Sequence, residues 1–94
     1  MTNEVGKVSD AMGKSVFNSQ FTDYEGTQTG AQVKALLNKA VATWRNNSSR
    51  NVTVNGMSTA NDIATYRASI NVNTTYSVSF GYDAEGYINS ITIS

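Results

Sequence analysis

Residues 32–44, which read QVKALLNKAVATW, decide the fold. Apolar residues recur there at i, i+3, i+4, i+7, i+8 and i+11, which places them in one continuous stripe along a helix. The stripe consists of Val33, Leu36, Leu37, Ala40, Val41 and Trp44. The opposite side is polar and carries Lys34, Asn38, Lys39 and Thr43. The pattern predicts an amphipathic helix, Gln32–Trp44, that packs its apolar side against the rest of a small domain.

Both ends of this helix carry recognisable signals. Thr29 is followed three residues later by Gln32, the capping-box pattern in which two N–H groups at a helix start are satisfied reciprocally. The run Asn46-Asn47-Ser48-Ser49 favours turns over a helix interior. The helix is therefore expected to end soon after Trp44.

The C-terminal part of the chain predicts a β-hairpin. Thr74–Tyr82 alternates and places on one face Tyr76, Val78, Phe80 and Tyr82. A second strand, Tyr87–Ile93, places on one face Tyr87, Asn89, Ile91 and Ile93. Between them Asp83–Gly86 fits a type I turn with Gly86 in the left-handed region. Two strands alone are not stable in water, so the helix stripe and a further strand must complete the core.

The remaining segments are predicted from shorter patterns. Residues 2–21 fit a helix, with Phe17 and Phe21 one turn apart, and Thr22–Gly30 fits a loop. Asn51–Gly56 alternates as a short strand with two valines on one side. Residues 57–73 fit either a short helix capped by Ser58 or Thr59 and carrying Ile63 and Tyr66, or an extended segment.

These elements predict an α+β fold in a single domain, since 94 residues suffice for one domain only. An N-terminal helix and the central amphipathic helix pack on a small three-stranded antiparallel sheet that ends in the hairpin. Residues 1–21 form an N-terminal helical stem, and residues 29–94 form the helix-plus-sheet core.

The composition removes whole classes of chemistry. The chain has no Cys and no His, so thiolate nucleophiles, disulfides and the commonest general base and zinc ligand are all excluded. Seven basic and seven acidic residues cancel, which argues against a nucleic-acid binder. We therefore expect no enzymatic activity, no catalytic residue, no cofactor and no metal ion.

Two acidic pairs are the remaining candidates for a site, Asp23 with Glu25 and Asp83 with Glu85. Paired carboxylates can cleave glycosides when held at a defined distance, but both pairs also suit turns. The expected ligand contacts, if the domain binds a small molecule, are Tyr24, Tyr82, Tyr87, Asp83 and Glu85. Tyr82 and Tyr87 fit equally well as a cross-strand pair near the turn.

Two segments together resemble a known group of proteins. Residues 17–27, FNSQFTDYEGT, run into residues 32–37, QVKALL, and residues 76–91 read YSVSFGYDAEGYINSI. They resemble short, uncharacterised proteins of Gram-positive gut bacteria that carry a hydrophobic N-terminal helix ahead of a small exported domain. The resemblance implies that residue 1 lies just past a removed membrane anchor. It implies no activity.

These observations lead to one expected function and two alternatives. The expected function is a non-enzymatic structural or interaction domain on the extracellular face of the cell membrane, tethered natively by an N-terminal helix. The first alternative is a pilin-like subunit of a filament or export machine, which self-associates through that helix. The second is a small glycan- or ligand-binding module. Nucleic acid is not an expected partner, and the membrane is one only through the removed segment.

Overall fold

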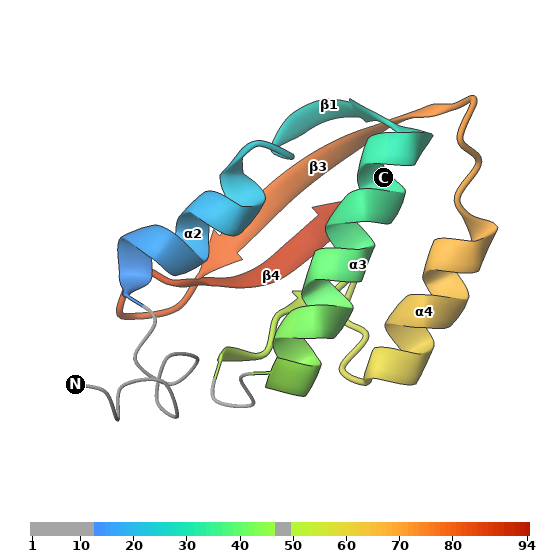
Figure 1. Cartoon of the computed structure of the whole chain (residues 1–94). Coiled ribbons are helices and arrows are strands. Elements are labelled where there is room, and N and C mark those ends of the chain that lie inside the picture. The colour runs from blue at the N-terminus through green and yellow to red at the C-terminus, as the bar shows by residue number, and fades with distance from the viewer. Residues whose placement is uncertain (1–12, 47–49) are drawn as a thin grey trace, which may run out of the picture.

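The computed structural model describes residues 13–46 and 50–94, and gives the backbone alone for residues 44–46. The elements in chain order are α2 (Lys14–Thr22), β1 (Gly26–Thr29), α3 (Gly30–Asn46), β2 (Thr53–Val54), α4 (Ala60–Ser69), β3 (Thr75–Tyr82) and β4 (Ile88–Ile93). Within these residues the helices lie together on one side of a single sheet (Figure 1). The α+β class is confirmed.

The sheet differs from the predicted one in strand number and in direction. It has four strands in the order β1-β3-β4-β2. The strand β3 is antiparallel to β1 and to β4, whereas β2 runs parallel to β4. The prediction of three antiparallel strands is therefore wrong. Alternation of apolar residues shows which side of a strand is buried, but it does not fix the direction of the neighbouring strand.

The additional strand, β1, lies in the segment that the sequence predicted as a loop. The strand has the sequence GTQT and contains no apolar side chain. Its one buried side chain is Gln28, whose amide nitrogen donates to the carbonyl oxygen of Glu25 at 3.0 Å. A strand that sends a single polar side chain toward the core has no apolar alternation to detect.

The central helix α3 confirms its predicted cap and buried side. The backbone N–H of Thr29 donates to Oε1 of Gln32 at 2.8 Å, and the N–H of Gln32 donates to Oγ1 of Thr29 at 3.2 Å. Four members of the apolar stripe are fully buried: Val33, Leu36, Leu37 and Ala40. The helix extends beyond the predicted bounds at both ends, and the side chain of Trp44 lies outside the described residues.

Two shorter helices complete the helical layer. In α2, Phe17 and Phe21 are buried with ring centroids 5.4 Å apart, while residues 1–12 of the predicted stem lie outside the described part. In α4, Oγ1 of Thr59 accepts the N–H of Asp62 at 3.1 Å and Ile63 is buried, which confirms the helical alternative for this region. None of the helices in residues 13–46 and 50–94 is long and apolar enough to span a bilayer.

The terminal hairpin has the predicted turn and an unpredicted bulge. Gly86 has φ +87° and donates its N–H to the carbonyl oxygen of Asp83 at 2.9 Å. Gly81 pairs with Ser90 but Tyr82 pairs with Ile88, so one extra residue, Asn89, enters β4. The bulge turns Ile88 into the core and leaves Asn89 exposed. The prediction that Asn89 shares a face with Ile91 and Ile93 is wrong for this reason.

A tight turn follows β2, and its first residue, Asn55, is hydrogen-bonded to β4. Asn55 and Gly56 have φ +50° and +80°, and Val54 exchanges backbone hydrogen bonds with Met57 at 3.2 and 2.8 Å. The N–H of Asn55 donates to the carbonyl oxygen of Ile91 at 2.8 Å. Its side-chain Oδ1 then accepts the N–H of Ile93 at 2.7 Å. The amide of Asn55 therefore continues the β2–β4 ladder after the backbone has turned away.

Substitution of Asn55 separates these two roles. We expect Asn55→Gly to lower the free energy of unfolding by about 1–2 kcal/mol, because it keeps the backbone conformation but leaves the N–H of Ile93 without its acceptor. Asn55→Ala is expected to cost about 1 kcal/mol more, since alanine also resists a positive φ. Urea unfolding of both variants measures the difference, and an equal loss in the two would contradict the conformational part.

Candidate functional site

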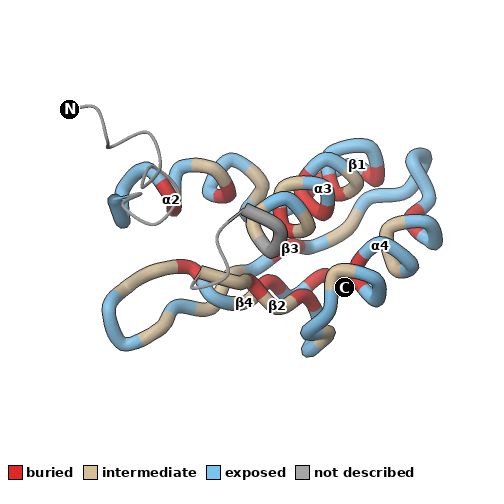
Figure 2. Tube along the Cα trace, turned by 60° about the horizontal axis from the view of Figure 1, so that its bottom comes forward, coloured by how far each residue is buried: buried red, intermediate tan, exposed pale blue. Residues whose placement is uncertain are grey.

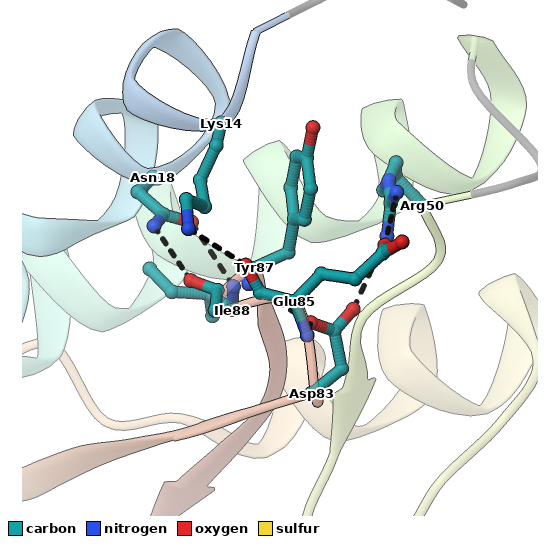
Figure 3. A network of polar contacts seen from close by, with 8 residues as sticks. Lys14, Asn18, Arg50, Asp83, Glu85, Tyr87 and Ile88 are labelled. Atoms are coloured by element: carbon teal, nitrogen blue, oxygen red, sulfur yellow. Dashed lines mark hydrogen bonds and ion pairs between the residues drawn. The ribbon is translucent and has the colours of Figure 1, made fainter.

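Polar side chains from three distant parts of the chain meet at the tip of the terminal hairpin (Figure 3). We call this the hairpin cluster. Its members are Lys14, Asn18, Arg50, Asp83, Glu85 and Tyr87. It contains three of the five residues that the sequence marked as ligand contacts.

Arg50 lies at the centre of the cluster. Its guanidinium contacts Oδ2 of Asp83 at 3.1 Å and Oε1 of Glu85 at 2.8 Å. The same guanidinium carbon sits 3.6 Å from the ring centroid of Tyr87, a cation–π contact. The hydrogen bond to Glu85 raises the pKa of Arg50 above its ordinary value. One cation thus pairs with both acids of the turn and lies over the aromatic ring beside them.

The helix α2 holds the other side of the hairpin. The ammonium of Lys14 donates to the carbonyl oxygen of Glu85 at 2.7 Å. Asn18 uses both ends of its amide, since Nδ2 donates to the carbonyl oxygen of Gly86 and Oδ1 accepts the N–H of Ile88, each at 3.0 Å. The side chain of Asn18 therefore acts as a short strand partner for β4.

The remaining predicted contacts lie elsewhere or pair differently. Tyr24 packs against the core at the turn between α2 and β1. Tyr82 is 51% exposed and stands opposite Ile88. Tyr87 instead meets Phe17 edge-on, with centroids 5.7 Å apart. The predicted Tyr82–Tyr87 cross-strand pair is wrong, because the turn closes between Asp83 and Tyr87, where the N–H of Asp83 donates to the carbonyl oxygen of Tyr87 at 2.9 Å, and Tyr82 then stands opposite Ile88.

The hairpin cluster is occupied by its own contacts. Oδ1 of Asp83 accepts the N–H groups of Glu85 and Tyr87 at 2.9 and 3.0 Å, while Oδ2 accepts from Arg50. Lys14 and Asn18 thus tie the hairpin to α2, and Arg50 ties it to the segment after α3. No group of three metal-ligating residues occurs within the described part of the chain.

The contacts of Asp83 in the hairpin cluster make the stability of the fold depend on pH. Partial desolvation raises the pKa of Asp83, but the N–H groups of Tyr87 and Glu85 and the charge of Arg50 together hold it below its ordinary value of 3.8. A depressed pKa in the folded state adds stability above the unfolded-state pKa, and this stability is lost as pH falls through the folded-state pKa. We expect the free energy of unfolding to decrease as the pH falls below about 5.

The measurement is an NMR titration of the Asp83 carboxyl carbon, combined with urea unfolding at several pH values. Arg50→Met removes one cause of the shift while the two backbone donors remain, so the pKa of Asp83 should rise only part of the way. A wild-type carboxyl that titrates at or above its ordinary pKa would contradict the assigned contacts.

A second surface, on the far side of the sheet from the helices, is built from small hydroxyl residues. Val78 faces Ile93 and Phe80 faces Ile91 on the helix side, so the residues between them point the other way. The registers bring together on this other side Thr27, Thr29, Thr53, Thr75, Ser77, Ser79, Ser90 and Thr92. We call this the Ser/Thr face.

The Ser/Thr face is continuous across all four strands and has no bulky side chain. Ser77 stands beside Thr27 and Ser79 beside Thr92. Further along, Gly81 stands beside Ser90, which in turn stands beside Thr53. Most of these hydroxyl residues are exposed, and Figure 2 shows the pale, exposed stretches that alternate with buried ones along the strands.

The described charged residues lie outside the four strands that form this face. They are on the helices (Lys14, Lys34, Lys39, Asp62 and Arg67), at the α2–β1 turn (Asp23 and Glu25) and in the hairpin cluster (Arg50, Asp83 and Glu85). The sequence signal for the face was present in the polar half of each alternation, S-x-S-x-G at residues 77–81 and S-x-T at residues 90–92. The apolar half of that alternation predicts only the buried side of the sheet, so the face was not predicted.

Comparison of the chain with protein-family models, with curated proteins and with solved structures finds no match. The resemblance of residues 17–37 and 76–91 to exported proteins of Gram-positive bacteria therefore stays a prediction.

Proposed function

We propose that the protein is a non-enzymatic interaction domain on the outer surface of a Gram-positive bacterium. In this proposal a segment N-terminal to the domain tethers it to the membrane. The domain then meets its partner with the Ser/Thr face, which the sheet turns away from its own helices.

The observation that carries the proposal is the charge-free, exposed character of the Ser/Thr face. In natural soluble domains about 25% of all residues are charged. Here an exposed surface that spans four strands contains Ser, Thr and Gly, while the described charged side chains lie elsewhere. Charged residues are depleted at the centres of protein interfaces as well, although Ser is depleted there too and aromatic residues are enriched.

The hairpin cluster supports a structural use of the acidic residues. Asp83 and Glu85 are held by Arg50, and Oδ1 of Asp83 also accepts two backbone N–H groups. These carboxylates position a turn. Their contacts favour an interaction domain over a hydrolase that would need both of them free to act on a substrate.

The cellular location can be tested by labelling with a thiol reagent. The chain has no Cys, so Thr65→Cys, at an exposed position on α4, creates a unique thiol within these residues. The variant is expressed as the full native protein in its host and treated with a membrane-impermeant maleimide. The proposal predicts labelling of intact cells. Labelling that requires cell lysis would overturn the surface location, and so would an upstream reading frame without an apolar run of about 20 residues.

A further inference from the structure

We infer that Asn55 is the site of a spontaneous covalent modification, deamidation through a cyclic imide, and that this reaction releases β2 from the edge of the sheet. The inference concerns the turn after β2 and is independent of the proposed function. It is carried by the Asn55-Gly56 pair, by the exposure of the turn and by the hydrogen bonds that join Asn55 to β4.

The reaction needs only the chain and water. The backbone nitrogen of Gly56 attacks Cγ of Asn55 and gives up its proton, the bond between Cγ and Nδ2 breaks, and Nδ2 leaves with that proton as ammonia. The product is a five-membered succinimide ring. Water then opens the ring at one of its two carbonyl groups. Opening at Cγ gives aspartate, and opening at the backbone carbonyl gives isoaspartate, whose main chain runs through Cβ and Cγ.

Asn55 is better placed for this reaction than any other asparagine of the chain. The sequence contains a single Asn-Gly pair, and each other asparagine is followed by a residue with a side chain. Glycine has no Cβ, so nothing beside the attacking nitrogen obstructs its approach to Cγ. Asn55 and Gly56 are both exposed, so water reaches the carboxamide and the ring. Asparagine is among the residues that are chemically labile in proteins.

The folded turn slows the reaction. Oδ1 of Asn55 accepts the N–H of Ile93 at 2.7 Å, which directs the carboxamide toward β4. The backbone meanwhile turns away from β4, with φ +50° at Asn55 and +80° at Gly56. Ring closure requires the carboxamide to leave β4 and meet the nitrogen of Gly56. The hydrogen bond to Ile93 must therefore break before Asn55 can react.

A local opening is enough to break this hydrogen bond. The strand β2 consists of Thr53 and Val54 alone, and it lies at the edge of the sheet, where it pairs with β4. Short segments with an exposed turn open at a lower free energy than the whole domain. Asn55 therefore reacts from a chain in which β2 has opened while the rest of the domain stays folded.

The two products differ in what they do to the sheet. Aspartate keeps a side-chain oxygen where Oδ1 lies, so it still accepts the N–H of Ile93. Isoaspartate adds a carbon atom to the main chain, so the residue can no longer bond to both Ile91 and Ile93 as Asn55 does. The edge of β4 then loses the partner that covers it, and an uncovered edge can pair with another chain.

The site is tested by incubating the purified chain at mildly alkaline pH and analysing the tryptic peptide 51–67 by mass spectrometry. Isoaspartate should accumulate at Asn55 several-fold faster than at Asn89, an exposed asparagine followed by Ser90. The same chain unfolded in guanidinium chloride should react several-fold faster still at Asn55. An Asn55 that reacts no faster than Asn89 would overturn the site, and equal rates in the folded and unfolded chain would overturn the protection by the turn.

Two core variants separate local opening from global unfolding. Val54→Ala loosens β2 at its pairing with Ile91, whereas Ile70→Ala removes buried contact at the end of α4. Both lower the stability of the domain, as urea unfolding measures. The reaction at Asn55 should be accelerated several-fold more by Val54→Ala than by Ile70→Ala. An equal or smaller acceleration by Val54→Ala would show that Asn55 reacts from the unfolded chain and would contradict the local opening.

The release of β2 is tested on the isoaspartyl chain, separated by chromatography, through amide hydrogen exchange. The N–H of Ile93 should lose its protection, while that of Thr92, which points to Ser79 on β3, should keep it. Freshly purified Asn55→Asp is the matched control and should keep both protected. An isoaspartyl chain in which Ile93 remains as protected as in the wild type would overturn the release. The surface location is unaffected by any of these results, since it depends on the maleimide labelling of intact cells.

Discussion

Replacing Gly30 by alanine is expected to lower the free energy of unfolding by about 3 kcal/mol, one of the two largest effects that we predict. Gly30 begins α3 and donates its N–H to the carbonyl oxygen of Thr74 at 2.7 Å. A Cβ at this position would overlap the carbonyl oxygen of Asn71 and lie 2.6 Å from its carbonyl carbon. These are backbone atoms, so neither can move away as a flexible side chain would. The start of α3 must shift, and the hydrogen bond to Thr74 weakens with it.

The measurement is urea unfolding, supported by a melting temperature that should fall by roughly 15 °C. Gly13→Ser is the matched control. Gly13 precedes α2 with open space around its Cα, and serine suits the N-cap position that Gly13 occupies. The control is expected to change stability by only a few tenths of a kcal/mol. A Gly30→Ala variant as stable as this control would show that α3 does not pack against Asn71.

Leu37→Ala is expected to have a comparable or larger effect, about 2–5 kcal/mol. Leu37 is 0% exposed and belongs to the single core cluster that joins the helices to the sheet. Truncation removes buried apolar contact and leaves a cavity that its neighbours fill only in part. Small domains have little stability to spare, so the variant should be partly unfolded at ordinary temperature.

The control for Leu37→Ala is the adjacent substitution Asn38→Ala, on the exposed side of the same helix. Its expected effect lies within about 0.5 kcal/mol of zero. The difference between the two variants measures the assignment of the buried side of α3. Equal melting temperatures would refute that assignment.

The helices and the hairpin turn could be predicted because each has a local signal. The stripe from Val33 to Ala40 and the cap between Thr29 and Gln32 are patterns within one element, and the structure confirms both. The same holds for the cap of α4 by Thr59 and for the turn at Gly86. Each signal depends on residues a few positions apart, so no tertiary information was needed.

The sheet could be predicted only in part because its order depends on distant segments. The parallel contact between β2 and β4 joins Val54 to Ile91, and no local pattern encodes that pairing. The Asn55-Gly56 dipeptide was an available signal for the tight turn after β2, since this pair favours two successive positive φ angles. This dipeptide predicts that the strand β2 ends at Val54, as it does in the structure.

The candidate site shows the same limit. The sequence identified Asp83, Glu85 and Tyr87, which do lie together in the structure. It did not identify Arg50 as the partner of Asp83, or Asn18 as the partner of Gly86, because 33 and 68 positions separate these contacts along the chain. With Arg50 beside them, the two acids anchor a turn.

The most direct test of the central claim, that the Ser/Thr face is the contact surface of the domain on the cell, compares two unique thiols. Ser79→Cys places a thiol on the face, and Thr65→Cys places one on the exposed side of α4. In the purified, dilute domain both should react with an impermeant maleimide at similar rates. On intact cells that carry the full native protein, Thr65→Cys should still react, whereas Ser79→Cys should react several-fold more slowly because a partner covers it. Equal reaction rates at the two positions on cells would contradict the claim.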